Sequence, residues 1–270
     1  MKKQKIDLIA EIGWNHMGNM NLAEKMIKAA SQSGASYAKF QTWRVKNLKN
    51  GPWDNDGRRE IYKKAELNED NYLKLSKICK KNNIKFLTSL FNLNDYELIK
   101  KLRLKSIKIP SPENRNKKLL EFCKKKFDTI ILSTGAASIT EIKNSFKILQ
   151  NKNTHLLHCV SAYPCEDKNV NIPRINKLKK ITKKVGLSDH SPDILSSVIS
   201  LPLGVTFIEK HFTVNNKLPG RDNKFAILPN EMKNLRRSVD RYIEMSKIKN
   251  KFIKEEVEVR KTYSGRWSKV

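Results

Sequence analysis

Two histidines, His190 and His211, are the residues whose type and position most directly indicate chemistry. Each closes a short apolar run and has an acidic neighbour, Asp189 before the first and Glu209 two positions before the second. If the two runs are consecutive parallel strands, their carboxyl ends face one pocket. Imidazole nitrogen suits Mn, Fe, Co or Zn, and two protein ligands leave positions free for water and substrate. Either histidine alone would more simply be a hydrogen-bonding loop residue, so it is the pairing that predicts a metal site.

Two lysines, Lys39 and Lys108, stand among apolar neighbours in segments 38–40 and 107–109. A lysine in a buried strand either points outward at a helix, which is costly, or serves as a buried cation for an anionic ligand. Hydroxyl groups recur at the ends of the apolar runs, at Ser89, Ser111, Ser133 and Ser188. Ammonium groups among hydroxyls suit a phosphate, alone or together with a carboxylate.

These groups must be positioned by a repeating pattern of strands and helices. Apolar, β-rich runs predict strands at residues 6–12, 37–40, 86–89, 106–109, 129–132, 154–158, 185–187 and 205–208. Apolar residues that recur every three or four positions predict helices at 21–33, 70–81, 94–101, 139–149 and 191–201. The longest connection contains a Gly/Pro/Asn/Asp-rich insert at 50–59, which predicts a loop over the strand ends.

Strand ends recur at an average spacing of roughly 28 residues, the size of a strand and its crossover helix. Eight such units predict the α/β class and, within it, a (β/α)8 TIM barrel. A doubly wound open sheet is the alternative, but no glycine-rich dinucleotide motif follows the first strand. We expect one barrel domain over residues 1–249 and a helical or extended tail over 250–270.

Composition limits the location and the partners of the chain. No apolar stretch approaches the roughly 20 residues of a membrane span, and the N-terminus is unlike a signal peptide, so we expect a cytoplasmic protein without a membrane partner. The four cysteines show no paired CxxC spacing, which predicts reduced thiols, and we expect Cys159 and Cys165 to serve packing. The net charge of +28 is spread over nearly every helix, so we expect no specific nucleic-acid partner. A positive field would still favour anionic substrates.

A series of ordered motifs resembles the sialic acid synthase family over residues 5 to about 245. They are Ala10-Glu11-Ile12-Gly13 with Asn15-His16 and Gly18, Lys39-Phe40-Gln41-Thr42, Lys108-Ile109 through Glu113, Leu132-Ser133-Thr134-Gly135, Ser188-Asp189-His190, Glu209-Lys210-His211-Phe212-Thr213 and Pro219-Gly220-Arg221-Asp222. Members of this family are (β/α)8 enzymes that condense phosphoenolpyruvate with an N-acetylated mannosamine-type sugar. The products are nonulosonic acids: N-acetylneuraminic, legionaminic or pseudaminic acid. Members typically need Mn²⁺, with Mg²⁺ or Co²⁺ as alternatives, and are commonly face-to-face homodimers.

The resemblance implies a role for each matching residue. Phosphoenolpyruvate would be held by Lys39, Ser89, Lys108, Ser111, Ser133, Ser161 and Ser188, and the metal by His190 and His211. The sugar would meet Gln41, Glu113, Tyr163, Arg221 and Asp222. Catalysis would fall to Glu11, Lys39, Lys108 and Tyr163, with Glu11 acting on the reacting water. Glu209 would share a strand face with His211 and orient it, whereas Asp189 would point the other way and serve structure.

The chain also departs from the family pattern. Members usually continue into an antifreeze-like domain that gives an arginine to the partner's sugar site, and we expect here the barrel without that domain or the N-terminal hairpin. Ser161 stands where asparagine is usual, and Pro110 and Pro112 flank Ser111 where small residues are usual. Arg221, beside Asp222, would partly replace the missing arginine.

Two alternatives remain open. One is another condensation of phosphoenolpyruvate with an aldose, giving an eight- or seven-carbon sugar acid. A phosphorylated aldose needs extra cations, and the 50–59 insert supplies only Arg58 and Arg59, so a nonphosphorylated acceptor is preferred. The other is a barrel that has lost catalysis and binds polyanions. The sequence does not decide which nonulosonic acid is made.

Overall fold

Eight parallel strands form a closed barrel in the computed structural model, which describes residues 5–248 and 250–268. In chain order the strands are β1 (Asp7–Gly13), β2 (Tyr37–Thr42), β3 (Lys85–Leu90), β4 (Ser106–Ile109), β5 (Thr129–Ser133), β6 (Asn153–Cys159), β7 (Val185–Asp189) and β8 (Phe207–His211). Each strand pairs with the next, and β8 closes on β1 with His211 opposite Glu11. The predicted (β/α)8 barrel is therefore confirmed.

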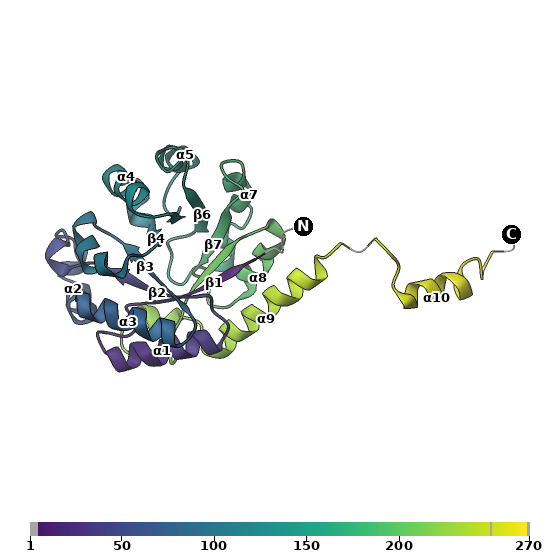
Figure 1. Cartoon of the computed structure of the whole chain (residues 1–270), viewed down its shortest axis with the longest axis horizontal. Coiled ribbons are helices and arrows are strands. Elements are labelled where there is room, and N and C mark those ends of the chain that lie inside the picture. The colour runs from purple at the N-terminus through teal and green to yellow at the C-terminus, as the bar shows by residue number, and fades with distance from the viewer. Residues whose placement is uncertain (1–4, 249, 269–270) are drawn as a thin grey trace.

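Helices surround the barrel, as Figure 1 shows. They are α1 (Met20–Gln32), α2 (Arg58–Ala65), α3 (Glu69–Lys81), α4 (Lys117–Lys126), α5 (Ile139–Ile148), α6 (Asp167–Val170), α7 (Arg174–Lys179), α8 (Leu195–Ser200), α9 (Pro229–Met245) and α10 (Lys254–Tyr263). Short 3₁₀ turns complete the connections: η1 (Val45–Asn47), η2 (Pro52–Asp54), η3 (Leu93–Leu98), η4 (Lys100–Leu102), η5 (Ser111–Glu113), η6 (Leu201–Leu203) and η7 (Asp222–Phe225).

Three predicted elements were misplaced. The helix expected at 94–101 is two 3₁₀ turns, because Asn92 caps the segment and Arg103 leaves it in a left-handed conformation with φ of 48°. The helix expected at 191–201 starts only at Leu195, since Ser191 is held by Asp189 through its backbone N–H and its hydroxyl. The last strand runs to His211 rather than stopping at 208, because its charged residues are buried against partners.

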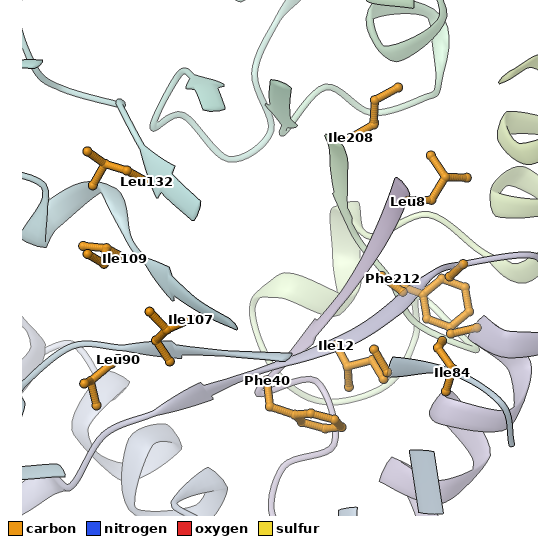
Figure 2. Close-up of a cluster of buried hydrophobic side chains, with 14 of the residues drawn as sticks. Leu8, Ile12, Phe40, Ile84, Leu90, Ile107, Ile109, Leu132, Ile208 and Phe212 are labelled. Atoms are coloured by element: carbon orange, nitrogen blue, oxygen red, sulfur yellow. The ribbon is translucent and has the colours of Figure 1, made fainter. Parts of the chain in front are cut away.

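Side chains of the barrel divide into two layers by strand alternation. Leu8, Ile107 and Ile208 belong to a large cluster between the strands and the helices (Figure 2). A smaller cluster consists of Ile9, Leu87, Ile131, Leu157 and Phe207. Because alternate residues share a strand face, each member of the smaller cluster lies on the same face as the residue two positions later, which is Glu11, Ser89, Ser133, Cys159 or Glu209. An apolar layer thus supports a polar layer at the carboxyl ends of the strands.

The segment after α9 differs from the rest of the chain. Helix α9 buries Met232, Leu235 and Val239, whereas every described residue from 250 to 268 is exposed. Figure 1 shows α10 projecting away from the barrel. Over the described residues, none of the helices combines the length and apolar character needed to cross a membrane.

Candidate active site

The polar layer lines a pocket of about 570 Å³ at the carboxyl ends of the strands. Of the residues assigned to the site from the sequence, those that line it are Glu11, Lys39, Gln41, Ser89, Lys108, Ser111, Glu113, Ser133, Tyr163, Ser188, His190, His211 and Asp222. They come from all eight strands or from the loops that follow them. The alternation of apolar and polar layers explains this convergence, since each strand places its last inward residue in one cavity.

Two lysines and two glutamates form a buried network at the floor of this pocket. Lys39 Nζ lies 2.5 Å from Glu11 Oε2 and 3.7 Å from Glu209 Oε2. Lys108 Nζ donates to both oxygens of Glu209, at 2.7 and 2.9 Å. Both lysine side chains point into the barrel, as we expected for buried cations.

Burial and pairing set the ionisation of this network. Burial raises the pKa of Glu11 above its usual range although Lys39 opposes it. Burial also acts to raise the pKa of Glu209, but Lys108 and Lys39 outweigh it and hold that pKa below its usual range. Glu209 is therefore a fixed anion, whereas Glu11 is the carboxyl group closer to exchanging a proton.

Serine hydroxyls line the same pocket as the lysines. Ser188 Oγ donates to Glu209 Oε1 at 2.9 Å, and Ser111 Oγ accepts the Gly135 backbone N–H at 3.2 Å. Gly135 allows close approach here, because a Cβ on it would lie 2.7 Å from Ser111 Oγ and would also meet Ser161 Oγ. Such hydroxyl groups and the two ammonium groups form a cavity suited to phosphate and carboxylate oxygens.

The two histidines meet as the sequence predicted. Their ring centroids lie 5.5 Å apart, and the Tyr163 ring lies 4.1 Å from that of His190. The His190 Nδ1 atom is 2.7 Å from the Val160 carbonyl oxygen. The His211 Nδ1 atom is buried and forms no hydrogen bond with any described residue, although Asp222 Oδ2 lies 3.5 Å away.

One of the two histidines, His211, has the neutral imidazole that metal binding requires. Burial, followed by the neighbouring His190, holds the pKa of His211 well below its usual range, so that imidazole is neutral. Burial raises the pKa of Asp222 to about 6 although the Trp14 indole donates to it. Among the described residues, no group of three or more His, Cys, Asp or Glu side chains is arranged to hold a metal ion.

The acidic neighbours of the histidines take different roles. Glu209 shares its strand face with His211, but its carboxylate binds Lys108 and Ser188 rather than the imidazole. Asp189 points away from the pocket, as expected, and pairs with Lys210 at 3.2 Å. Its oxygens accept hydrogen bonds from the hydroxyls of Ser191, Ser196 and Ser197.

Two residues assigned from the family resemblance do not line the pocket. Ser161 is exposed in the loop after β6, with its hydroxyl beside Gly135. Arg221 is exposed immediately before η7, while the adjacent Asp222 faces the cavity.

Sequence reasoning also missed residues of the pocket. Cys159, expected to serve packing, ends β6 and lines the cavity, with its Sγ 4.0 Å from His190 Nδ1. Four rings that contact one another, Trp14, Trp43, Tyr62 and Phe91, also line the cavity, and we call them the aromatic wall. Trp14 and Trp43 follow the first two strands within two residues. Their position at strand ends is the feature of the sequence from which a place in the pocket could have been predicted.

A closed barrel that gathers cations, hydroxyls and paired histidines at the carboxyl ends of its strands has the architecture of a TIM-barrel enzyme. Comparison with known proteins gives the family. The chain belongs to the NeuB family, whose model matches residues 26–251.

Relatives and solved structures agree with this assignment. The N,N'-diacetyllegionaminic acid synthase of Campylobacter jejuni is 38% identical over 87% of this chain and 75% of that protein. The N-acetylneuraminate-9-phosphate synthase of Homo sapiens is 30% identical over 86% of this chain and 68% of that protein. The crystal structure of the N-acetylneuraminic acid synthetase of Leptospira borgpetersenii superposes with a TM-score of 0.88 at 30% identity, covering 97% of this chain and 93% of that chain. The chain is therefore an enzyme of a synthase family that makes sialic-type acids.

Proposed function

We propose that the enzyme condenses phosphoenolpyruvate with a nonphosphorylated, N-acetylated hexosamine to give a nonulosonic acid and inorganic phosphate. The observation that carries this proposal is the pair of buried lysines, Lys39 and Lys108, in the same cavity as the two histidines. The names of the relatives support the class of product, and the geometry supports a division of the cavity into an anion half and an acceptor half.

The anion half takes phosphoenolpyruvate. Lys39 and Lys108 supply the charge for its phosphate and carboxylate, and the hydroxyls that line the same half are those of Ser89, Ser111, Ser133 and Ser188. The two glutamates balance the lysines before the substrate arrives, which lowers the cost of burying the cations.

The acceptor half is proposed to hold a divalent metal, Mn²⁺ in the first place, at His190 and His211. The residues fit such an ion, because the His211 Nδ1 atom is buried without a hydrogen bond to the described residues and its imidazole is neutral. Only two protein ligands are offered, so remaining positions would be filled by water and acceptor oxygens. When bound, the ion supplies Lewis acidity that polarises the acceptor's aldehyde oxygen.

The remaining steps follow from the residues of the chain. C3 of phosphoenolpyruvate attacks the aldehyde carbon, forming the new C–C bond while positive charge develops at C2. The Glu11 and Glu209 carboxyl groups lie within the same network as the lysines and shield that charge. Water adds at C2 and gives one proton to Glu11, while the former aldehyde oxygen takes up a proton and becomes the new hydroxyl group. The C2–O bond to phosphate then breaks as the hydroxyl formed at C2 loses its proton, which gives the 2-keto acid and inorganic phosphate.

The acceptor is proposed to carry no phosphate because the two arginines of the 50–59 insert are already paired. Arg58 binds Asp56 with a shortest N–O distance of 2.6 Å, and Arg59 binds Asp54 at 2.5 Å. Neither of these two lines the cavity, whereas Arg44 and Lys49 do, with Arg44 Nε 3.9 Å from Asp95 Oδ1. The pairing of Arg58 and Arg59 favours a nonphosphorylated acceptor, and the inclusion of arabinose 5-phosphate in the test below checks whether Arg44 and Lys49 bind a phosphate.

The test is phosphate release from phosphoenolpyruvate with Mn²⁺ against N-acetylmannosamine, 2,4-diacetamido-trideoxyhexoses and arabinose 5-phosphate. We expect release with an N-acetylated sugar, abolished by a chelator and by His211→Ala. Binding of Mn²⁺, followed directly by electron paramagnetic resonance, should be weakened by the same variant. Release only with arabinose 5-phosphate would overturn the acceptor class. Unchanged Mn²⁺ binding in the variant would overturn the metal site, and no release with any sugar would overturn the reaction.

A further inference from the structure

The aromatic wall is a connected set of rings on one side of the cavity. Trp14 stacks on Tyr62 with centroids 4.9 Å apart. Trp43 meets Trp14, Tyr62 and Phe91 edge-on, each at 6.2 Å. Edge-to-face and offset-stacked contacts of this kind hold rings rigidly, so the wall presents a fixed apolar surface.

The wall faces the cavity and is not simply loop packing. All four rings line it, and Trp43, Tyr62 and Phe91 keep part of their surface exposed. The Trp43 Nε1 atom is buried without a hydrogen-bond acceptor among residues 5–248 and 250–268. A buried indole N–H without an acceptor is costly, so a ligand carbonyl oxygen that reached it would gain a hydrogen bond.

The wall is joined to the reacting end of the acceptor. The Trp14 indole N–H donates to Asp222 Oδ2, and the same oxygen lies 3.5 Å from His211 Nδ1. An acceptor whose aldehyde sits at the histidine pair is therefore within reach of the wall through Trp14. We place its distal substituents against the rings.

Ring faces discriminate among those substituents. Indole and phenol faces cover methyl groups and planar amides well, but they leave most hydroxyl groups without hydrogen-bond partners, which costs free energy. An acceptor with a second acetamido group and a deoxy carbon fits this surface better than one with hydroxyls at the same positions.

We infer that the aromatic wall makes the enzyme selective for a 2,4-diacetamido-trideoxyhexose over N-acetylmannosamine. This inference rests on the proposed condensation and specifies its acceptor. Burial of one methyl-sized group is worth roughly fourfold in binding, so two such groups give a preference on the order of tenfold. The wild-type ratio of kcat/KM for the two sugars measures that preference without any variant.

Variants then assign the preference to the wall. Trp43→Ala should lower kcat/KM for the diacetamido sugar by about tenfold more than it lowers kcat/KM for N-acetylmannosamine, so that the ratio of the two values falls toward one. Trp43→Phe keeps a ring and should retain most of the preference. Trp267→Ala is the matched control, because Trp267 is 91% exposed in the tail and should leave both values unchanged.

Sugar binding is measured as well as turnover. The two measurements distinguish a failure of the proposed condensation from a failure of the proposed selectivity. Three of the four tryptophans, at 14, 43 and 53, line the cavity, and their fluorescence reports which sugar binds more tightly. Equal or reversed selectivity in the wild type would overturn the inference while leaving the condensation intact. If a folded Trp43→Ala variant kept the wild-type ratio of kcat/KM for the two sugars, the aromatic wall would not be the cause of the preference. Selective binding without phosphate release would support the wall and overturn the proposed reaction.

Discussion

Lys108 and Glu209 form an ion pair across the barrel, with Lys108 Nζ 2.7 Å from Glu209 Oε1 and 2.9 Å from Oε2. The two residues are 101 positions apart in the chain, and both are buried. The same carboxylate accepts from Ser188 and lies 3.7 Å from Lys39. Glu209 thus pairs with both cations and offsets part of the cost of burying them.

Replacing Lys108 by methionine should abolish phosphoenolpyruvate binding and lower phosphate release by about 10²–10³-fold or more, because a charged donor is lost from a water-excluded site. The same change breaks a buried pair and should cost about 3–5 kcal/mol of stability. Calorimetric titration with phosphoenolpyruvate and thermal unfolding measure the two effects.

A double variant separates binding from stability. Lys108→Met combined with Glu209→Gln removes the uncompensated carboxylate, so it should recover much of the thermal midpoint without recovering substrate binding. Lys105→Met, three residues earlier and exposed, serves as the matched control and should behave as wild type. Tight phosphoenolpyruvate binding by the double variant would contradict the assigned role of Lys108.

Gly135→Ala should raise the KM for phosphoenolpyruvate about tenfold with little change in the thermal midpoint. The added Cβ would lie closest to Ser161 Oγ and 2.7 Å from Ser111 Oγ, so both hydroxyl groups must move. Displacing a positioning group costs on the order of 10–100-fold in kcat/KM, and because Ser111 is proposed to bind the substrate we expect the loss in KM. Steady-state kinetics with varied phosphoenolpyruvate tests this expectation, and an unchanged KM would show that Ser111 does not contact the substrate.

Much of the fold and of the site was predictable because strand periodicity and strand-end polarity are local signals. Lys39 and Lys108 were identified from their apolar neighbours alone, and the structure places both in the cavity. The length of β8 was not predictable in this way. Glu209 and Lys210 look like loop residues until their partners, Lys108 and Asp189, are known from the tertiary structure.

The aromatic wall was missed for a related reason. Tyr62 lies on α2 and Phe91 follows β3, so their convergence on Trp14 and Trp43 depends on how the loop at 43–57 folds over the barrel. No periodic pattern in the sequence predicts the conformation of that loop. Glu209 was expected to orient His211, and strand alternation placed it on the correct face but did not show which neighbour on that face it would bind.

Helix α5 provides a pH-dependent test of stability at a distance from the site. Glu141 accepts the Ser138 backbone N–H and binds Arg115, and these contacts lower its pKa to about 2. A carboxyl group with a lowered pKa contributes stability above its unfolded pKa of 4.5 and loses it as the pH falls toward 2. Glu141→Gln should therefore lower the thermal midpoint at pH 7 by roughly 1–2 °C, and the difference from wild type should shrink between pH 4.5 and pH 2.

The capping partner supplies the control for that experiment. Ser138→Ala removes a hydroxyl that does not titrate in this range, so most of its effect on the midpoint should persist at low pH. A Glu141→Gln difference that stays constant from pH 7 to pH 3 would show that the carboxylate contributes nothing through its charge.

Removal of residues 250–270 should leave the thermal midpoint of the barrel unchanged. Helix α9 already ends the packed structure at Met245, and Phe252, Val259 and Trp267 are 59%, 55% and 91% exposed. Side chains that remain in water in the folded chain contribute little to its stability. Differential scanning calorimetry of the shortened chain at low concentration measures this, and a drop of several degrees would show that the tail packs on its own barrel. Sedimentation equilibrium of both chains gives the complementary result, because a tail that packs on a second copy changes the mass at high concentration while leaving the midpoint of the isolated barrel the same.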